Sequence, residues 1–237
     1  MVEIDIFRKL MEAEERRRRE ERRVLVEHIE IKEVLPCITT PGYIRFTAQA
    51  DAELREVIPV LFLSFPPGKA VYNEAEGSLT LRLYNRLISL FPSGKIGVTN
   101  TRDLKEAEEV LSKIRDFINE AYSTYLRVGP PRREDIEAVK KLSWMDIYRH
   151  LPKTNCGECG YKTCQALALK VLLGEARLSQ CVKLKEEKYR SNLKRLKETL
   201  GPFLLKALGW EGSGLSLIHI SEPTRPLYIS YAVFCLK

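Results

Sequence analysis

Apolar residues in the first half of the chain follow two different spacings. In residues 79–84 the leucines at 79, 81 and 83 alternate with other side chains, which is the period of a half-buried strand. Residues 101–121 place their apolar side chains three and four positions apart, and this spacing predicts an amphipathic helix. Thr101 or Asp103 can cap its start. The apolar face of this predicted helix consists of Leu104, Ala107, Val110, Leu111, Ile114 and Ile118.

The same patterns predict an α+β unit over residues 29–126. Residues 53–65 have helical spacing, with Pro59 favouring an early or kinked start. Pro41-Gly42 is typical of a turn between two strands. The order is strands, helix, antiparallel strands, helix, so we predict an antiparallel sheet with two helices. The predicted strands are residues 31–39, 43–48, 69–73, 79–84, 87–91 and 95–99.

Residues 5–30 read as one helix, and we treat residues 1–28 as a separate charged N-terminal segment. The run RRRREERR at 16–23 places Glu three or four positions from Arg, which is typical of a solvent-exposed helix. A basic helix can also neutralise phosphates. An arm that binds nucleic acid or a partner protein is therefore the alternative interpretation.

A second unit begins after residues 129–133, whose sequence is GPPRR. Paired prolines stiffen a linker and remove backbone donors, so we place a domain boundary there. Residues 134–210 then form a small helical domain. Its predicted helices are residues 134–141, 143–150, 165–173, 183–200 and, after a break at Gly201-Pro202, residues 203–210.

The chain changes character after Trp210. Within residues 211–237, the stretch LSLIHISEPTRPLYISYAVFCLK resembles the translated read-through of a sequencing adapter. We predict that this tail is not native and leave it out of the fold. A genuine hydrophobic strand is the alternative. On the first interpretation, His219 and Cys235 belong to no site.

Composition limits the class of protein. The chain has 237 residues and a formal net charge of +7, which permits an acidic protein or nucleic-acid partner and requires neither. No apolar run approaches the ~20 residues that span a bilayer, and the charged N-terminus does not resemble a signal peptide. We expect a soluble, cytoplasmic protein. In that compartment clustered cysteines bind metal more often than they form disulfides.

Four of the 6 cysteines lie close together, with the spacing C-x2-C-x4-C-x16-C. Thiolates suit soft metals and iron–sulfur clusters, and we expect these four to bind one [4Fe-4S] cluster. Gly157 and Gly160 relax the backbone of the loop around Cys156 and Cys159. The third cysteine precedes an apolar helical run, and a helix N-terminus favours an anionic cluster. The four expected cofactor and metal ligands are Cys156, Cys159, Cys164 and Cys181.

Zinc is the alternative occupant. It also takes four cysteines, although usually from two C-x2-C pairs, and only Cys156 and Cys159 form such a pair here. His150 would be a fifth candidate for a four-ligand site, and we expect it to be a surface or core residue instead. Cys37 is too isolated in the sequence to be assigned as a ligand, and we expect a small buried hydrophobic residue.

The sequence LPKTNCGECGYKTC, preceded by MDIYRH and followed by an apolar helix and SQC, resembles the [4Fe-4S] domain of the corrinoid iron–sulfur protein large subunit. The same small domain occurs in the B subunit of the Rnf electron-transport complex and in related reductases and activators. The resemblance covers about residues 142–185 and implies a low-potential, one-electron cluster on the four cysteines. The barrel and cobamide domain of the corrinoid protein have no counterpart in this sequence, so methyl transfer is not implied.

Residues 83–118, LYNRLISLFPSGKIGVTNTRDLKEAEEVLSKIRDFI, resemble the second half of one repeat of the TATA-binding protein. That protein has two repeats arranged as a saddle, and only one is found here. The resemblance implies a sheet that could dimerise or bind DNA. Phe91 stands where that family has apolar wedges, but we expect it to pack in the core or hairpin. The whole chain thus resembles a small archaeal iron–sulfur protein, with a cluster domain joined to such a repeat.

Three functions fit these observations. We favour a cluster-binding protein that transfers one electron, or serves as a redox accessory module, for a partner enzyme. The alternatives are a redox-sensing regulator that binds nucleic acid, and a cluster or zinc ion with a purely structural role. No phosphate loop, dinucleotide fingerprint or base–nucleophile pair is recognisable in the sequence. We therefore do not expect an enzyme that acts alone.

Overall fold

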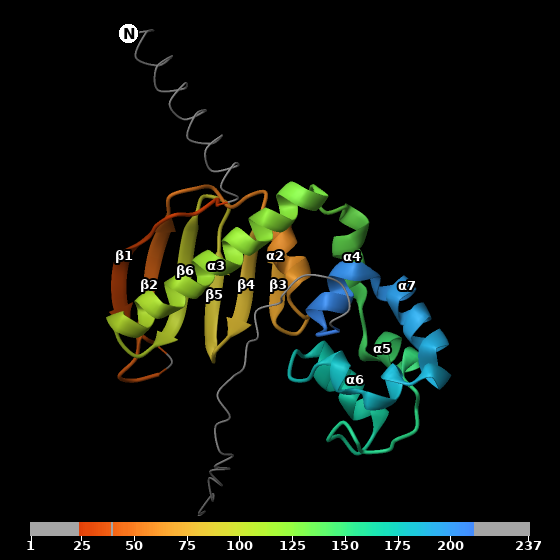
Figure 1. Cartoon of the computed structure of the whole chain (residues 1–237). Helices are drawn as coiled ribbons and strands as arrows, with labels where there is room; N and C mark the ends of the chain where they lie inside the picture. Colours follow the sequence, from red (N-terminus) through yellow and green to blue (C-terminus); the bar gives the residue numbers. More distant parts are fainter. Residues whose placement is uncertain (1–23, 39, 211–237) are drawn as a thin grey trace, which may run out of the picture.

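A computed structural model describes residues 24–38 and 40–210. These residues form an α+β fold, as predicted, with a six-stranded antiparallel sheet followed by a helical part (Figure 1). The predicted N-terminal helix, up to residue 23, and the tail 211–237 lie outside the described residues. The sheet has the order β1-β2-β6-β5-β4-β3. Its strands are β1 Ile29–Pro36, β2 Ile44–Ala50, β3 Ala70–Asn73, β4 Ser78–Leu83, β5 Arg86–Leu90 and β6 Lys95–Thr101.

The leucine alternation in β4 forms part of the core face of the sheet, as predicted. Leu79 and Leu81 are buried, whereas Arg82 is exposed. The strand register places Leu81 beside Ile88 of β5, and Ile88 beside Val98 of β6. These paired side chains lie on the same face of the sheet, because successive residues of a strand point to opposite faces and paired residues point to the same one.

Two helices cover this core face. Helix α2 spans Ile58–Ser64 and helix α3 spans Leu104–Val128, and α3 runs across the sheet in Figure 1. The cap of α3 is Asp103, whose side chain accepts a hydrogen bond from the backbone N–H of Glu106 at 2.8 Å. Thr101, the other predicted cap, is instead the last residue of β6 and is fully buried.

Several predicted helix bounds were wrong. The helix expected from residue 53 begins at Ile58, with Pro59 in its first turn, where a missing N–H costs nothing. Helix α3 continues past residue 121 to Val128. Residues 24–28 are not helical. The side chain of Asn119 bonds the backbone of residues 25 and 26, so tertiary contacts override any helical tendency there.

Short helices make up the C-terminal part. They are α4 Arg133–Lys141, α5 Trp144–His150, α6 Cys164–Leu172 and α7 Arg190–Ala207, with the 3-10 turns η1 Leu178–Gln180, η2 Val182–Lys185 and η3 Glu187–Tyr189. The helix predicted from residue 183 therefore starts later, after η2 and η3. The predicted break at Gly201 is present, because its backbone leaves helical geometry at φ 68° and ψ 171°.

The sheet and the helical part meet at the loop after α2. The N–H of Gly68 donates to the carbonyl oxygen of Leu172, at the end of α6, at 3.1 Å. Lys140 of α4 and Glu74, after β3, form an ion pair at 2.6 Å. Apolar residues of both parts belong to one continuous buried cluster. Among the described helices, none combines the length and apolar character required to cross a membrane.

Candidate metal centre

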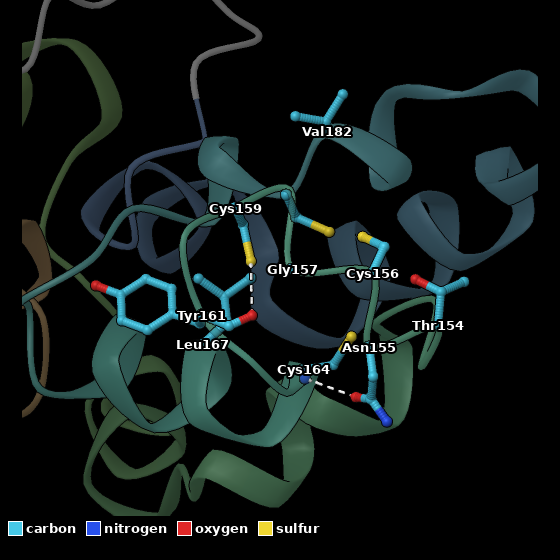
Figure 2. Close-up of a pocket in the computed structure, with 10 residues that line it drawn as sticks. Thr154, Asn155, Cys156, Gly157, Cys159, Tyr161, Cys164, Leu167 and Val182 are labelled. Atoms are coloured by element: carbon cyan, nitrogen blue, oxygen red, sulfur yellow. Dashed lines mark hydrogen bonds between the residues drawn. The ribbon is translucent and has the colours of Figure 1, made fainter.

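The four clustered cysteines line one cavity in the helical part. Figure 2 shows the sulfur atoms of Cys156, Cys159 and Cys164 directed into this common space. Cys181 lines it as well, and neither a carboxylate nor an imidazole is among the lining side chains. The lining residues are Thr154, Asn155, Cys156, Gly157, Cys159, Tyr161, Cys164, Leu167, Cys181 and Val182.

The loop that carries Cys156 and Cys159 is shaped by left-handed backbone. Lys153, Asn155 and Gly157 have φ values of 59°, 49° and 76°. Alternation of this kind turns successive backbone N–H groups toward one side and forms a concavity suited to anions, including iron–sulfur clusters. The expected role of the glycine at 157 is therefore consistent with the observed backbone.

Helix α6 presents Cys164 at its first residue, as predicted. Thr163 is the N-cap, and its Oγ1 accepts a hydrogen bond from the N–H of Ala166 at 3.1 Å. Leu167 and Val171 on the same helix are buried and anchor it in the core. The positive end of the helix dipole therefore lies beside the Cys164 thiol.

Cys181 lies between η1 and η2 and is 5% exposed. Burial raises the pKa of its thiol, and the neighbouring Cys164, Cys159 and Cys156 raise it further, while the N–H of Leu184 lowers it. Four thiolates in one cavity thus repel one another, and a cationic centre relieves that repulsion. The donor set fits a soft metal centre on this ground.

An ion pair ties the two cysteine-bearing segments together. Nζ of Lys183, in η2, lies 3.2 Å from Oε1 of Glu158 and 2.9 Å from Oε1 of Glu186. Glu158 belongs to the C-x2-C loop. Lys183 therefore joins the loop of Cys156 to the segment that follows Cys181. No local pattern predicts this contact, because it depends on how two distant segments fold together.

The remaining candidates lie elsewhere. Nε2 of His150 is 3.3 Å from Oγ1 of Thr199 on α7, and His150 is not among the cavity residues. Burial lowers the pKa of its imidazole, with Arg195 adding to the effect. Cys37 is half-buried rather than buried. Within the described residues no three His, Cys, Asp or Glu side chains converge on a single-ion position.

Asn155 was missed by sequence reasoning. Its side chain lines the cavity and bonds the N–H of Cys164. Asn is favoured at left-handed backbone positions, so the residue type indicates the turn at 155, but not its partner nine residues further on.

Comparison with known proteins identifies the chemistry of this region. Residues 151–183 match the family model described as "Putative Fe-S cluster". A stretch of 63 residues is 49% identical to the acetyl-CoA decarbonylase/synthase complex subunit gamma of Methanocaldococcus jannaschii, which is 27% of this chain and 13% of that subunit. A stretch of 40 residues is 50% identical to the corrinoid/iron-sulfur protein large subunit of Moorella thermoacetica, covering 17% of this chain and 9% of the relative.

A third relative is an uncharacterized protein of Methanocaldococcus jannaschii, 35% identical over 66 residues, or 28% of this chain and 30% of that protein. No solved structure matches the chain. The matches confirm the resemblance to the corrinoid iron–sulfur protein, and the chain carries an iron–sulfur cluster domain. They extend over a small part of each relative, so the common feature is this domain.

Proposed function

We propose that Cys156, Cys159, Cys164 and Cys181 bind one [4Fe-4S] cluster and that the protein transfers single electrons for a partner enzyme. The observation that carries this proposal is the convergence of four thiols on one cavity, with no carboxylate or imidazole in its lining. When bound, such a cluster supplies a one-electron couple whose potential depends on hydrogen bonds and solvent exposure.

The cavity has a buried side and an exposed side. Cys164, the first residue of α6, is 6% exposed, whereas Cys156 is exposed. Val182, next to Cys181, is 48% exposed. One edge of the centre therefore reaches the surface beside an exposed apolar side chain, as a redox protein needs for exchange with a partner. We propose this Cys156–Val182 edge as the face through which electrons pass.

A partner protein is part of the proposal. The Methanocaldococcus jannaschii relative named first above is a subunit of a complex, and a one-electron centre needs a second molecule to supply or accept its electron. The matches cover 13% and 9% of the two relatives with known names, so the proposal is limited to electron transfer. An archaeal origin is consistent with the methanogen relatives.

We also propose that residues 29–126 and 134–210 act as two structural units with a fixed junction. The hydrogen bond from Gly68 to Leu172 and the Lys140–Glu74 ion pair support this arrangement. In it, the sheet unit holds the far end of α6, while Cys164 at the near end faces the centre.

The direct test is anaerobic purification of the full chain, followed by iron, sulfide and zinc analysis and reduction monitored by EPR. The proposal expects about four irons per chain and a reversible one-electron signal. A purified protein that contains zinc and no iron would contradict the proposal. Iron without a reversible reduction would leave a structural cluster and contradict electron transfer.

A nucleic-acid-binding regulator is the second candidate, and one observation favours it. Strands β2 to β6 contain no acidic residue. On the face away from α2 and α3, Thr47, Gly97, Ser89 and Thr80 lie in one row across the sheet. Arg82 and Lys95 are exposed. A single repeat like that of the TATA-binding protein is the fold proposed with this candidate.

Duplex DNA binding at several salt concentrations tests the regulator. It predicts binding that weakens steeply with salt and that falls in an Arg82→Ser, Lys95→Ser variant. Binding unchanged by these two substitutions, or no binding at low salt, would remove this candidate and leave the electron-transfer proposal untouched.

A further inference from the structure

Asn155 links the two segments that carry Cys156 and Cys164. Its Oδ1 accepts a hydrogen bond from the backbone N–H of Cys164 at 2.9 Å, across a sequence separation of 9. Figure 2 shows this bond between the cysteine loop and the first turn of α6. Since Asn155 directly precedes Cys156, one side chain ties together the backbone segments that carry two of the thiols.

The position makes two demands on its residue. The backbone at Asn155 is left-handed, with φ 49°, a conformation that Asn and Asp tolerate better than other residues with a side chain. The side chain must also place an acceptor at the N-terminus of α6. Asparagine and aspartate meet both demands, glycine meets only the first, and alanine meets neither.

The first turn of α6 depends on this acceptor. The first N–H groups of a helix have no partner within the helix. Thr163 satisfies the N–H of Ala166, and Asn155 satisfies that of Cys164. Cys164 is buried, so water cannot readily replace the amide oxygen. Without Asn155 the start of the helix, and the thiol it carries, would lose their fixed position.

We propose that Asn155 is a positioning residue for the cluster: it holds the Cys156 loop against the N-terminus of α6, so that both thiols face the cavity before the cluster binds. The inference rests on the ligand set proposed above. Because the amide is neutral, it does so without placing a carboxylate beside the centre, and this choice sets the reduction potential as well as the geometry.

Three full-length variants separate the two demands: Asn155→Asp, Asn155→Gly and Asn155→Ala. After anaerobic reconstitution, the glycine and alanine variants should release iron to a chelator about 10–100-fold faster than the wild type, the usual effect of losing a residue that orients metal ligands. The aspartate variant should retain iron like the wild type but show a lower midpoint potential, since a negative charge disfavours the reduced cluster. Asn73→Gly is the matched control, because Asn73 caps a turn with its Oδ1 and is not among the cavity residues.

Two outcomes would overturn the inference. One is iron release from Asn155→Gly at the wild-type rate, which would mean that the left-handed backbone alone matters. The other is an unchanged midpoint potential in Asn155→Asp. If the wild type binds no iron, the proposed ligand set is wrong. Hydrogen exchange in the iron-free chain then tests the role of Asn155 separately. The amide of Cys164 should then exchange faster in Asn155→Gly than in the wild type, and equal rates would contradict the role of Asn155.

Discussion

The N–H of Gly68 donates to the carbonyl oxygen of Leu172 at 3.1 Å, which joins the loop after α2 to the end of the helix that begins with Cys164. The contact is close enough to exclude a side chain, because a Cβ at Gly68 would lie 2.6 Å from the Cα of Leu173. The loop between α2 and β3 therefore contacts the end of α6 through backbone at this point, and the fit there depends on a glycine.

Replacing Gly68 with alanine should force this junction apart. Overpacking costs about 1–3 kcal/mol in a buried core. Gly68 is exposed, so the backbone can shift to relieve part of the overlap, and the free energy of unfolding in urea titrations should fall by at most that amount. Gly97→Ala is the control, because a Cβ at Gly97 meets no atom within 4 Å. Equal stabilities for the two variants would show that the junction is not closely packed in solution.

The cysteines should separate into two groups when each is replaced by alanine. Loss of Cys164 or Cys181, the two buried ligands, should abolish iron binding, because neither thiolate has a substitute in the cavity. Cys37→Ala should bind the wild-type amount of iron, since Cys37 does not line the cavity. Iron analysis after reconstitution measures all three, and full iron binding by Cys164→Ala would refute the assignment.

Stability of the sheet unit should depend on pH through Glu106. Burial alone raises the pKa of this carboxyl, but hydrogen bonds from the backbone and guanidinium of Arg102, and from Arg86, outweigh it and lower the pKa to about 2. Oε1 of Glu106 lies 2.6 Å from a guanidinium nitrogen of Arg86, in a largely buried pair. Because the pKa of Glu106 is lower in the folded state than in the unfolded state, where it is 4.5, its ionised form stabilises the fold at pH values above 4.5.

This stabilisation should be lost as the pH falls from about 4.5 toward 2 and should amount to at most about 3 kcal/mol. Glu106→Gln should remove that pH dependence from the free energy of unfolding. Glu137→Gln, which breaks exposed ion pairs with Arg133 and Lys141, should change the stability by less than about 1 kcal/mol. A Glu106→Gln profile that matches the wild type would contradict the role of this pair.

Electron exchange should depend on Val182. Val182→Asn replaces an exposed apolar side chain at the edge of the cavity with a neutral polar one, so the midpoint potential should stay nearly constant. The second-order rate constant for reduction by a ferredoxin should fall about fivefold or more, as expected when a contact worth ~1 kcal/mol is lost from a docking face. Met145→Asn is the control, since Met145 is 51% exposed and does not line the cavity. Equal rates for both variants would mean that partners dock elsewhere.

Sequence patterns predicted the sheet well because local signals and the core agree there. The leucine alternation of β4 and the predicted Pro41-Gly42 turn, between β1 and β2, both appear in the fold. The predicted bounds of helices were wrong where tertiary contacts determine where a helix begins or ends. Residues 25 and 26 are held by the side chain of Asn119, a residue more than ninety positions away, and no local pattern announces such a contact.

The sequence predicted the proposed ligands of the candidate site, but it predicted less well the residues that hold those ligands in place. Cysteine spacing and the helix start at Cys164 follow from local sequence. The Lys183–Glu158 ion pair does not, because it joins segments whose separation in space depends on the whole helical part. Asn155 lies between these cases. Its residue type fits a left-handed backbone position, but its hydrogen-bond partner, the N–H of Cys164, is known only from the position of α6 in the fold.

Mössbauer spectroscopy of the anaerobically reconstituted full chain, enriched in ⁵⁷Fe, shows directly whether the four cysteines bind one [4Fe-4S] cluster. We predict the spectrum of a single [4Fe-4S] cluster, with about four irons per chain, and its absence from Cys164→Ala. A spectrum of mononuclear iron, or a chain that binds zinc and excludes iron under the same conditions, would contradict the proposed ligand set.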